Sequence, residues 1–233
     1  MSGTGEATAQ VPCSDASRAR AEPLTATASR VERWLLVEHR GAWGPQSVPS
    51  TRMTQNVARA LAQTAAGAAA RLVLVRRPHG APQSDGRDVF AVDSTPRAER
   101  IRTRHVDDDT DLAKLGWEDA EWGAYDGPLY LVCTHGRHDR CCALRGRPVA
   151  QALSQVHPER TWESSHIGGD RFAPNLVVLP EGLYLGQVEA GDVVRLVEDL
   201  TAGRLPAGHV RGRSSLPLPV QAAQAFAREA LQR

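Results

Sequence analysis

The chain has 233 residues, of which 41% are hydrophobic and 24% charged, and these proportions are typical of a soluble globular protein with one large or two small domains. A net charge of +1 argues against binding to nucleic acid or to an anionic membrane surface. No run approaches the roughly 20 apolar residues of a membrane span, and residues 1–10 lack the features of a secretory signal. We therefore expect a cytoplasmic protein, in which clustered cysteines bind metal or act in catalysis more often than they form disulfides.

The first half of the chain alternates between apolar runs and apolar residues at helical spacing. Residues 1–30 lack periodicity, and we expect a mobile or extended segment in which at least the first dozen residues are mobile. Apolar residues at helical spacing predict an amphipathic helix over 53–68, and a short helix is expected near 111–115. Strands are predicted at 33–39, 71–75, 88–93 and 100–106.

A turn at 126–128 ends this pattern, and a similar pattern then restarts. One helix is expected to begin with Pro148 in its first turn, because proline is favoured there. A second helix is expected to be capped by Asp192, and a last amphipathic helix covers 218–231. Strands are predicted at 129–132, 160–164, 175–180 and 183–188.

Each half therefore reads as a strand, a helix, three strands and a helix, which predicts an α/β (α+β) fold. In the second half this is the order of a thioredoxin-like domain. Residues 36–41 resemble residues 131–136, so the first half would be a degenerate thioredoxin-like repeat unless the match is chance. We predict an N-terminal segment 1–30, an α/β half 31–126 without metal ligands, a thioredoxin-like half 127–203, and a C-terminal tail 204–233 with the terminal helix.

Three of the four cysteines lie within ten residues, as Cys133, Cys141 and Cys142, whereas Cys13 stands alone in the sequence. The segment 133–142 follows a predicted strand and precedes a predicted helix, where the backbone N–H groups and the helix dipole favour anionic sulfur. The same segment contains His135 and His138, which are either loop residues or ligands. This clustering predicts a metal centre, although inert buried cysteines remain the simpler alternative.

A second polar segment, 164–172, also follows a predicted strand. It contains His166 and Asp170 on either side of two glycines. In a thioredoxin-like order the two strands can be neighbours, so their loops can offer sulfur and imidazole to one site. Gly168 and Gly169 would let the backbone approach that site closely.

Several enzyme motifs are absent from the sequence. A phosphatase Cys-x5-Arg loop fails because Asp139 holds the arginine position, and neither a Cys-x-x-Cys nor a Gly-x-Ser-x-Gly motif occurs. The acidic run 107–109 is typical of a solvated turn or a helix cap. The sequence therefore carries no hydrolase signature.

Taken together, these segments resemble the sucrase/ferredoxin-like family, also called thioredoxin-like ferredoxins. The resemblance rests on Cys13-Ser14, Glu22–Leu24, Trp34–Glu38, Cys133–Cys142, His166–Asn175, Leu179–Gly186 and Arg211–Ser214. It implies a thioredoxin-like fold in the second half. It also implies a [2Fe-2S] cluster whose ligands follow the pattern Cys-x8-Cys and His-x3-His.

Cys133, Cys142 and His166 match three of the four ligands that the resemblance implies, but Asp170 stands where the family has its second histidine. Three alternatives follow: Asp170 is the fourth ligand through a carboxylate oxygen, Cys141 replaces it, or the cluster has been lost. We favour Asp170 because it holds the matching position. Adjacent side chains point in different directions, which argues against joint ligation by Cys141 and Cys142.

The function that this resemblance implies is one-electron transfer to or from a redox partner protein that the sequence does not identify; an electron carrier is favoured over an enzyme. Three arginines flank the two loops and would either surround the cluster, form a docking surface or be ordinary surface residues. They are Arg137, Arg140 and Arg171.

The alternative to an electron carrier is a zinc-binding or cluster-free thioredoxin-like interaction module. Zinc would be held by Cys133, Cys142 and His166 with one of Asp170, His135 or His138.

Overall fold

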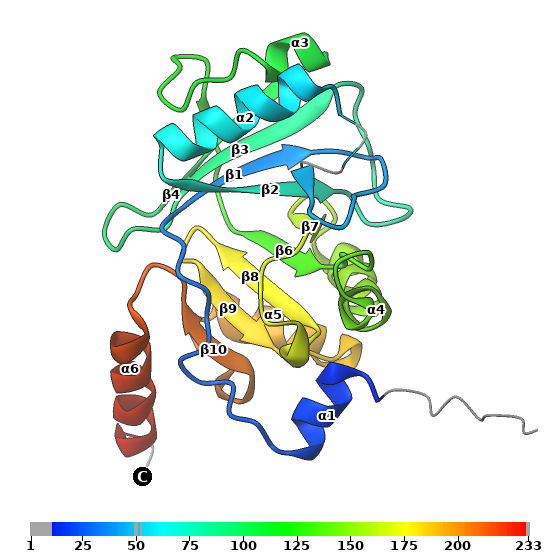
Figure 1. The fold of residues 1–233 in the computed structure, drawn as a ribbon. Coiled ribbons are helices and arrows are strands. Elements are labelled where there is room, and N and C mark those ends of the chain that lie inside the picture. Colours follow the sequence, from blue (N-terminus) through cyan, green and yellow to red (C-terminus); the bar gives the residue numbers. More distant parts are fainter. Residues whose placement is uncertain (1–10, 49–50, 52, 232–233) are drawn as a thin grey trace, which may run out of the picture.

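A computed structural model describes residues 11–48, 51 and 53–231, so residues 1–10 of the predicted mobile segment lie outside the described residues. Within the rest of that segment, Cys13–Ala19 form a short helix, α1. Sequence periodicity did not predict this helix, because its seven residues are too few to show a repeating apolar face. Figure 1 shows α1 beside the lower half of the molecule, far from the first half in space.

The ten strands of the described residues belong to one sheet, in the order β10-β9-β8-β6-β7-β2-β1-β3-β4-β5. The strands of the first half are β1 (Arg33–Glu38), β2 (Ala70–Arg76), β3 (Arg87–Asp93), β4 (Arg100–Val106) and β5 (Gly123–Ala124). Those of the second half are β6 (Leu129–Cys133), β7 (Thr161–Ser164), β8 (Asn175–Leu179), β9 (Leu183–Gly186) and β10 (Val210–Arg213). The sheet continues across the boundary predicted near residue 126, and β10 adds part of the predicted tail to it.

Each half of the sheet is covered by its own helices (Figure 1). Helices α2 (Gln55–Gly67) and α3 (Asp109–Leu112) share a core with the strands of the first half. Helices α4 (Arg140–Val156) and α5 (Val193–Thr201) share a core with the strands of the second. Helix α6 (Leu218–Leu231) follows β10. No helix of the described chain is long and apolar enough to cross a membrane.

The two halves have the same strand topology, and the fold is mixed α/β as predicted. In the first half β1 pairs parallel with β2 and antiparallel with β3, which pairs antiparallel with β4. In the second half β6 pairs in the same way with β7 and β8, and β8 with β9. This is the thioredoxin-like arrangement, repeated. The repeats meet where β2 pairs antiparallel with β7, at Val75 opposite Ser164 and Arg76 opposite Glu163.

A third hydrophobic core lies between the halves. It combines Trp34, Phe90 and other residues of the first-half strands with Trp162, Tyr184 and other residues of the second-half strands. The rings of Trp34 and Tyr184 have centroids 6.1 Å apart, and those of Phe90 and Trp162 are 5.5 Å apart. Because each half contributes the strand faces opposite its own helices, neither half has a complete core by itself.

Charged residues that the sequence left without a role also join the halves. Arg76 contacts Glu163 of β7 at 2.7 Å and lies over the ring of Trp43, 4.3 Å from its centroid. Arg77 lies over the ring of Trp162, 3.6 Å from its centroid. Arg76 and Arg77 therefore hold the first half against the second.

Two helix starts differ from the predictions. Helix α4 begins at Arg140, so Pro148 lies inside the helix rather than in its first turn. The reason is the side chain of Asp139, whose Oδ1 accepts a hydrogen bond from the N–H of Cys141 at 2.6 Å and caps the helix. At the start of α5, the side chain of Asp192 makes no capping hydrogen bond.

Candidate metal centre

The end of β6 and the start of α4 bring two thiols together. Cys133 is the last residue of β6, Cys142 lies in the first turn of α4, and each is 1% exposed. Their sulfur atoms and a ring nitrogen of His166 all lie within 4.8 Å of one another. The structure thus brings together three of the residues that the sequence predicted as ligands.

His166 reaches this point from the loop after β7, and the loop depends on its two glycines. Gly168 and Gly169 have φ angles of 102° and 86°, in the region that favours glycine. A Cβ on Gly168 would lie 2.4 Å from Oγ of Ser29, and a Cβ on Gly169 would lie 2.4 Å from Nη2 of Arg211. The close approach expected from the sequence is therefore toward Ser29 and Arg211, which hold the loop in place.

The carbonyl groups of this loop accept hydrogen bonds from several distant elements. Arg71 of β2 donates to the carbonyl oxygens of His166 at 2.9 Å and Ile167 at 3.1 Å. Tyr184 of β9 also donates to Ile167, at 2.9 Å. Arg211 of β10, which is 2% exposed, donates to Gly168 at 3.0 Å. The sequence did not identify Arg71 and Arg211 as supports of the site, because both residues are far from the loop in the sequence and belong to no motif that includes it.

Asp170 lies beside both kinds of donor. Its Oδ1 is 3.2 Å from Sγ of Cys142 and 3.0 Å from Nδ1 of His166. When His166 is protonated, this contact with Nδ1 is an ion pair, although it lacks hydrogen-bond geometry. A cation that binds Nδ1 would take the place of the proton that the carboxylate of Asp170 stabilises.

Cys141 faces away from the other two clustered cysteines. Its Sγ lies 3.5 Å from Sγ of Cys13, which α1 brings to the start of α4. In a helix, successive side chains are about 100° apart, so Cys141 and Cys142 cannot both point at one centre. Cys13, which stands alone in the sequence, thus has a sulfur neighbour in the structure.

The sequence is similar to a known protein family. The sequence model of the sucrase/ferredoxin-like family matches residues 24–212. The chain belongs to the sucrase/ferredoxin-like family. No curated protein matches it.

Two solved structures of a thioredoxin-like [2Fe-2S] ferredoxin from Aquifex aeolicus are similar to part of this family member. One is 26% identical, covers 40% of this chain and 97% of its own, and superposes with a TM-score of 0.34. The other, a cysteine-to-serine variant, is 26% identical, covers 37% of this chain and 100% of its own, and has a TM-score of 0.33.

In this member of the family, His135 supports the site rather than offering a free nitrogen. Its Nε2 lies 2.8 Å from the carbonyl oxygen of Gly44, and its Nδ1 accepts a hydrogen bond from the N–H of His166 at 3.1 Å. Both ring nitrogens are therefore engaged, with the proton on Nε2. Burial lowers the pKa of His135, which keeps the ring neutral. His135 connects the first half to the loop that carries His166.

His138 lies at the outer side of the site. Its ring stacks on that of His166 with centroids 3.7 Å apart, and its Nε2 is 3.7 Å from Oδ2 of Asp170. His138, His166 and Asp170 form a second group of donors within 4.8 Å of one another. His166 thus belongs both to the thiol group and to this outer group.

The side chains of the centre control one another's protonation. The hydrogen bond with Cys142 lowers the pKa of Cys133 well below its usual value, although burial opposes this, and raises the pKa of Cys142, as burial also does. Burial would lower the pKa of His166, but Asp170 and Cys133 outweigh it and raise the pKa to about 9. Burial would raise the pKa of Asp170, yet His166 lowers it. A cation that binds here therefore displaces protons from Cys142 and His166.

The three flanking arginines have different surroundings. Arg171 pairs with Glu22 at 2.5 Å and lies over the ring of Phe172, 4.4 Å from its centroid. Arg137 and Arg140 are exposed at the start of α4. Arg171 thus fastens the segment after α1 to the turn at Asp170–Phe172, a role that the sequence did not predict.

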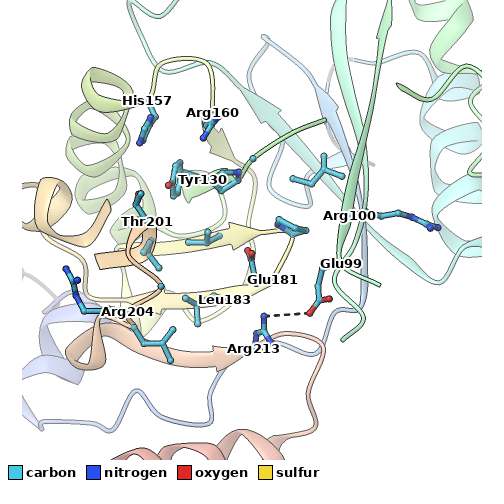
Figure 2. Close-up of a pocket in the computed structure, with 18 of the residues that line it drawn as sticks. Glu99, Arg100, Tyr130, His157, Arg160, Glu181, Leu183, Thr201, Arg204 and Arg213 are labelled. Atoms are coloured by element: carbon cyan, nitrogen blue, oxygen red, sulfur yellow. Dashed lines mark ion pairs between the residues drawn. The ribbon is translucent and has the colours of Figure 1, made fainter. Parts of the chain in front are cut away.

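Figure 2 shows a cleft of about 970 Å³ that is separate from this centre. Tyr130, His157 and Arg160 line one part of it, and Glu99 and Arg213, an ion pair at 3.8 Å, line another. None of the predicted ligands lines this cleft. A second cleft, of about 680 Å³, is lined by His138 and His166 and gives access to the outer donors.

Proposed function

We propose that the chain holds a [2Fe-2S] cluster through Cys133, Cys142, His166 and Asp170 and acts as a one-electron carrier. The observation that carries the proposal is the convergence of two buried thiols and the imidazole of His166 within 4.8 Å of one another, with Asp170 Oδ1 3.2 Å from Cys142 Sγ and 3.0 Å from His166 Nδ1. Membership of the sucrase/ferredoxin-like family also supports it.

The chemical nature of the donors fits such a cluster. Thiolates are the usual ligands of iron–sulfur clusters, and imidazoles replace two of them in one known class. Cys133 is already inclined to the thiolate form. The buried Nδ1 of His166 would bind iron after losing the proton that Asp170 stabilises.

The geometry favours Asp170 over Cys141 as the fourth ligand. Asp170 Oδ1 lies within 3.2 Å of both Cys142 Sγ and His166 Nδ1. Cys141 Sγ lies instead next to Cys13 Sγ. The residue in the position matching the family pattern is thus also the residue with an oxygen near the other donors.

The cluster, when bound, supplies a centre that gains and loses one electron. The side chains that would hold the cluster differ in burial. His166 and Asp170 have side chains that are 20% and 27% exposed, and His166 lines the 680 Å³ cleft. We propose that a redox partner protein approaches through this cleft, because electrons would then travel the shortest path to the cluster.

The test is metal and sulfide analysis of the full chain after anaerobic purification. The wild-type protein should be red-brown, with iron and acid-labile sulfide in equal amounts of about two per chain. Cys142→Ser and Asp170→Ala should lower the iron content. Cys141→Ser is the matched control for Cys142→Ser and should retain iron.

A colourless protein without iron, whose zinc is lost in the Cys142→Ser variant, would identify the centre as a zinc site. Loss of iron in Cys141→Ser but not in Asp170→Ala would assign the fourth ligand to Cys141. Circular dichroism of each variant establishes that loss of metal does not reflect loss of the fold.

A further inference from the structure

A second group of metal-binding side chains lies on the other side of the start of α4. It consists of Cys13, Asp139 and Cys141, whose ligand atoms all lie within 4.8 Å of one another. The two sulfur atoms are 3.5 Å apart, and Sγ of Cys13 is 3.6 Å from Oδ2 of Asp139. Residues separated by 128 positions in the sequence thus place two thiols and a carboxylate together.

These distances can be compared with the edges of a zinc tetrahedron. Zinc–sulfur bonds of about 2.3 Å and zinc–oxygen bonds of about 2.1 Å at tetrahedral angles give a sulfur–sulfur edge of about 3.8 Å and a sulfur–oxygen edge of about 3.6 Å. The distances of 3.5 Å between the sulfurs and 3.6 Å between Cys13 Sγ and Asp139 Oδ2 are within a few tenths of an ångström of these edges. These two pairs therefore need little movement to bind zinc, and the ligand atoms of the third pair, Asp139 and Cys141, lie within 4.8 Å of each other.

A disulfide between the same cysteines fits the geometry less well. It would require the sulfur atoms to approach from 3.5 Å to about 2.05 Å. A disulfide also gives no role to the carboxylate of Asp139, whose Oδ2 lies beside Cys13 while its Oδ1 caps α4. A divalent cation accounts for all three side chains, because it would offset two of the three negative charges that two thiolates and a carboxylate carry.

We propose that Cys13, Asp139 and Cys141 form a zinc site, separate from the centre at Cys133 and Cys142. Two thiolates favour a borderline-soft ion such as Zn²⁺ over Mg²⁺ or Ca²⁺. On binding, the two thiols release their protons to solvent. Because Cys13 is exposed, water can take the fourth position.

The site has a structural role in joining α1 to the metal-centre region. Helix α1 packs against the turn Asp170–Phe172, and Arg145 of α4 pairs with Asp15 and donates to Ser14 at 3.1 Å. These polar contacts are partly exposed and each is weak. Zinc would fasten α1 to α4 at the residue next to Cys142. The proposal does not depend on which cofactor Cys142 binds.

The experiment measures zinc and iron per chain in the full-length protein, purified under reducing conditions and dialysed against a small excess of Zn²⁺. Wild type should hold one more zinc per chain than Cys13→Ser or Cys141→Ser, while all three hold the same amount of iron. Asp139→Asn keeps a capping side chain and should weaken zinc binding about tenfold or more, since even residues outside the first coordination shell contribute that much. Val11→Ser, at an exposed position near Cys13, is the control and should match wild type.

Equal zinc in wild type and Cys13→Ser would overturn the proposal. So would a peptide map without reductant in which Cys13 is crosslinked to Cys141. Replacing zinc by Co²⁺ gives a second measurement, because thiolate-to-cobalt absorption should be present in wild type and in Val11→Ser and weaker in Cys13→Ser. If iron is absent from every sample, the iron–sulfur proposal fails, but the difference in zinc between wild type and Cys13→Ser still tests this site.

Discussion

Asp170 sets the charge of the outer end of the proposed cluster. A carboxylate adds one negative charge where the family pattern has a neutral imidazole. Its Oδ1 lies 3.0 Å from His166 Nδ1, so its charge acts directly on the neighbouring ligand. A single residue therefore distinguishes this chain electrostatically from the two-histidine pattern.

The Asp170→His variant should have a higher reduction potential than wild type. The reduced cluster carries one more negative charge, so removing a negative ligand stabilises it. A potentiometric titration followed by electron paramagnetic resonance measures the change. Glu189→Gln removes an exposed carboxylate that pairs with Arg18 and should leave the potential unchanged. A potential in Asp170→His equal to or below that of wild type would contradict this account.

His39 should make the protein less stable in mild acid. It is buried, its Nε2 has no hydrogen-bond partner among the described residues, and burial followed by Arg87 lowers its pKa from 6.5. As the pH falls below about 6.5, the unfolded chain takes up a proton that the folded chain resists, so the free energy of unfolding decreases.

Urea unfolding at pH 7 and pH 5.5 measures this effect. His39→Gln should show a smaller loss of stability between these two pH values than wild type does. His79→Gln, at an exposed position, should retain the full loss. An identical pH dependence in wild type and His39→Gln would show that other groups account for it.

At the scale of elements, the junction of β2 and β7 depends on a buried carboxylate. Glu163 of β7 is 7% exposed and accepts hydrogen bonds from Arg76 at 2.8 Å and from the hydroxyl of Thr134 at 3.0 Å. Thr134 directly follows Cys133. The junction between the halves and the end of the strand that carries Cys133 therefore share one carboxylate.

Glu163→Gln should lower the free energy of unfolding by about 2 kcal/mol, the usual cost of losing hydrogen bonds to a charged group. Chemical denaturation monitored by circular dichroism gives the value. Glu159→Gln makes the same substitution at a side chain that is 62% exposed and should change stability by less than about 0.5 kcal/mol. Equal effects of the two substitutions would mean that the junction does not depend on Glu163.

At the scale of the whole molecule, we expect the two thioredoxin-like repeats to unfold as one cooperative unit. They share a continuous sheet and a core built from strand residues of both. The first repeat also contributes Arg71 and the carbonyl of Gly44 to the loops of the metal centre. The first half therefore supports the loops that carry the predicted ligands of the second half.

Leu61→Ala tests this cooperativity from the outer core of the first half. Leu61 is fully buried on α2, and its truncation should cost about 2–5 kcal/mol. Far-ultraviolet circular dichroism and tryptophan fluorescence should still show one coincident unfolding transition, shifted to lower denaturant concentration. Leu218→Ala, at a position that is 54% exposed, should have little effect. Two separate transitions in Leu61→Ala would show that the halves unfold independently.

The sequence alone predicted most elements and part of the site. Local apolar patterns indicate strands and helices because burial of one face repeats with the period of the element. The predicted strand 129–132 corresponds to β6, and the predicted helix 53–68 to α2. The clustering of Cys133 and Cys142 and the two glycines after His166 pointed to the segments that meet in the structure.

Only the tertiary structure decided which side chains meet. The start of α4 depends on the hydrogen bond from Cys141 to Asp139, and that start directs Cys142 toward Asp170 and Cys141 toward Cys13. Arg71 supports the His166 loop from a strand some 95 positions earlier. Such contacts leave no periodic trace in the sequence, because they depend on how distant strands and helices are stacked rather than on the spacing of neighbouring residues. The sequence by itself thus determined the elements and the residues able to bind metal. The packing of the two repeats decided which of those residues lie together.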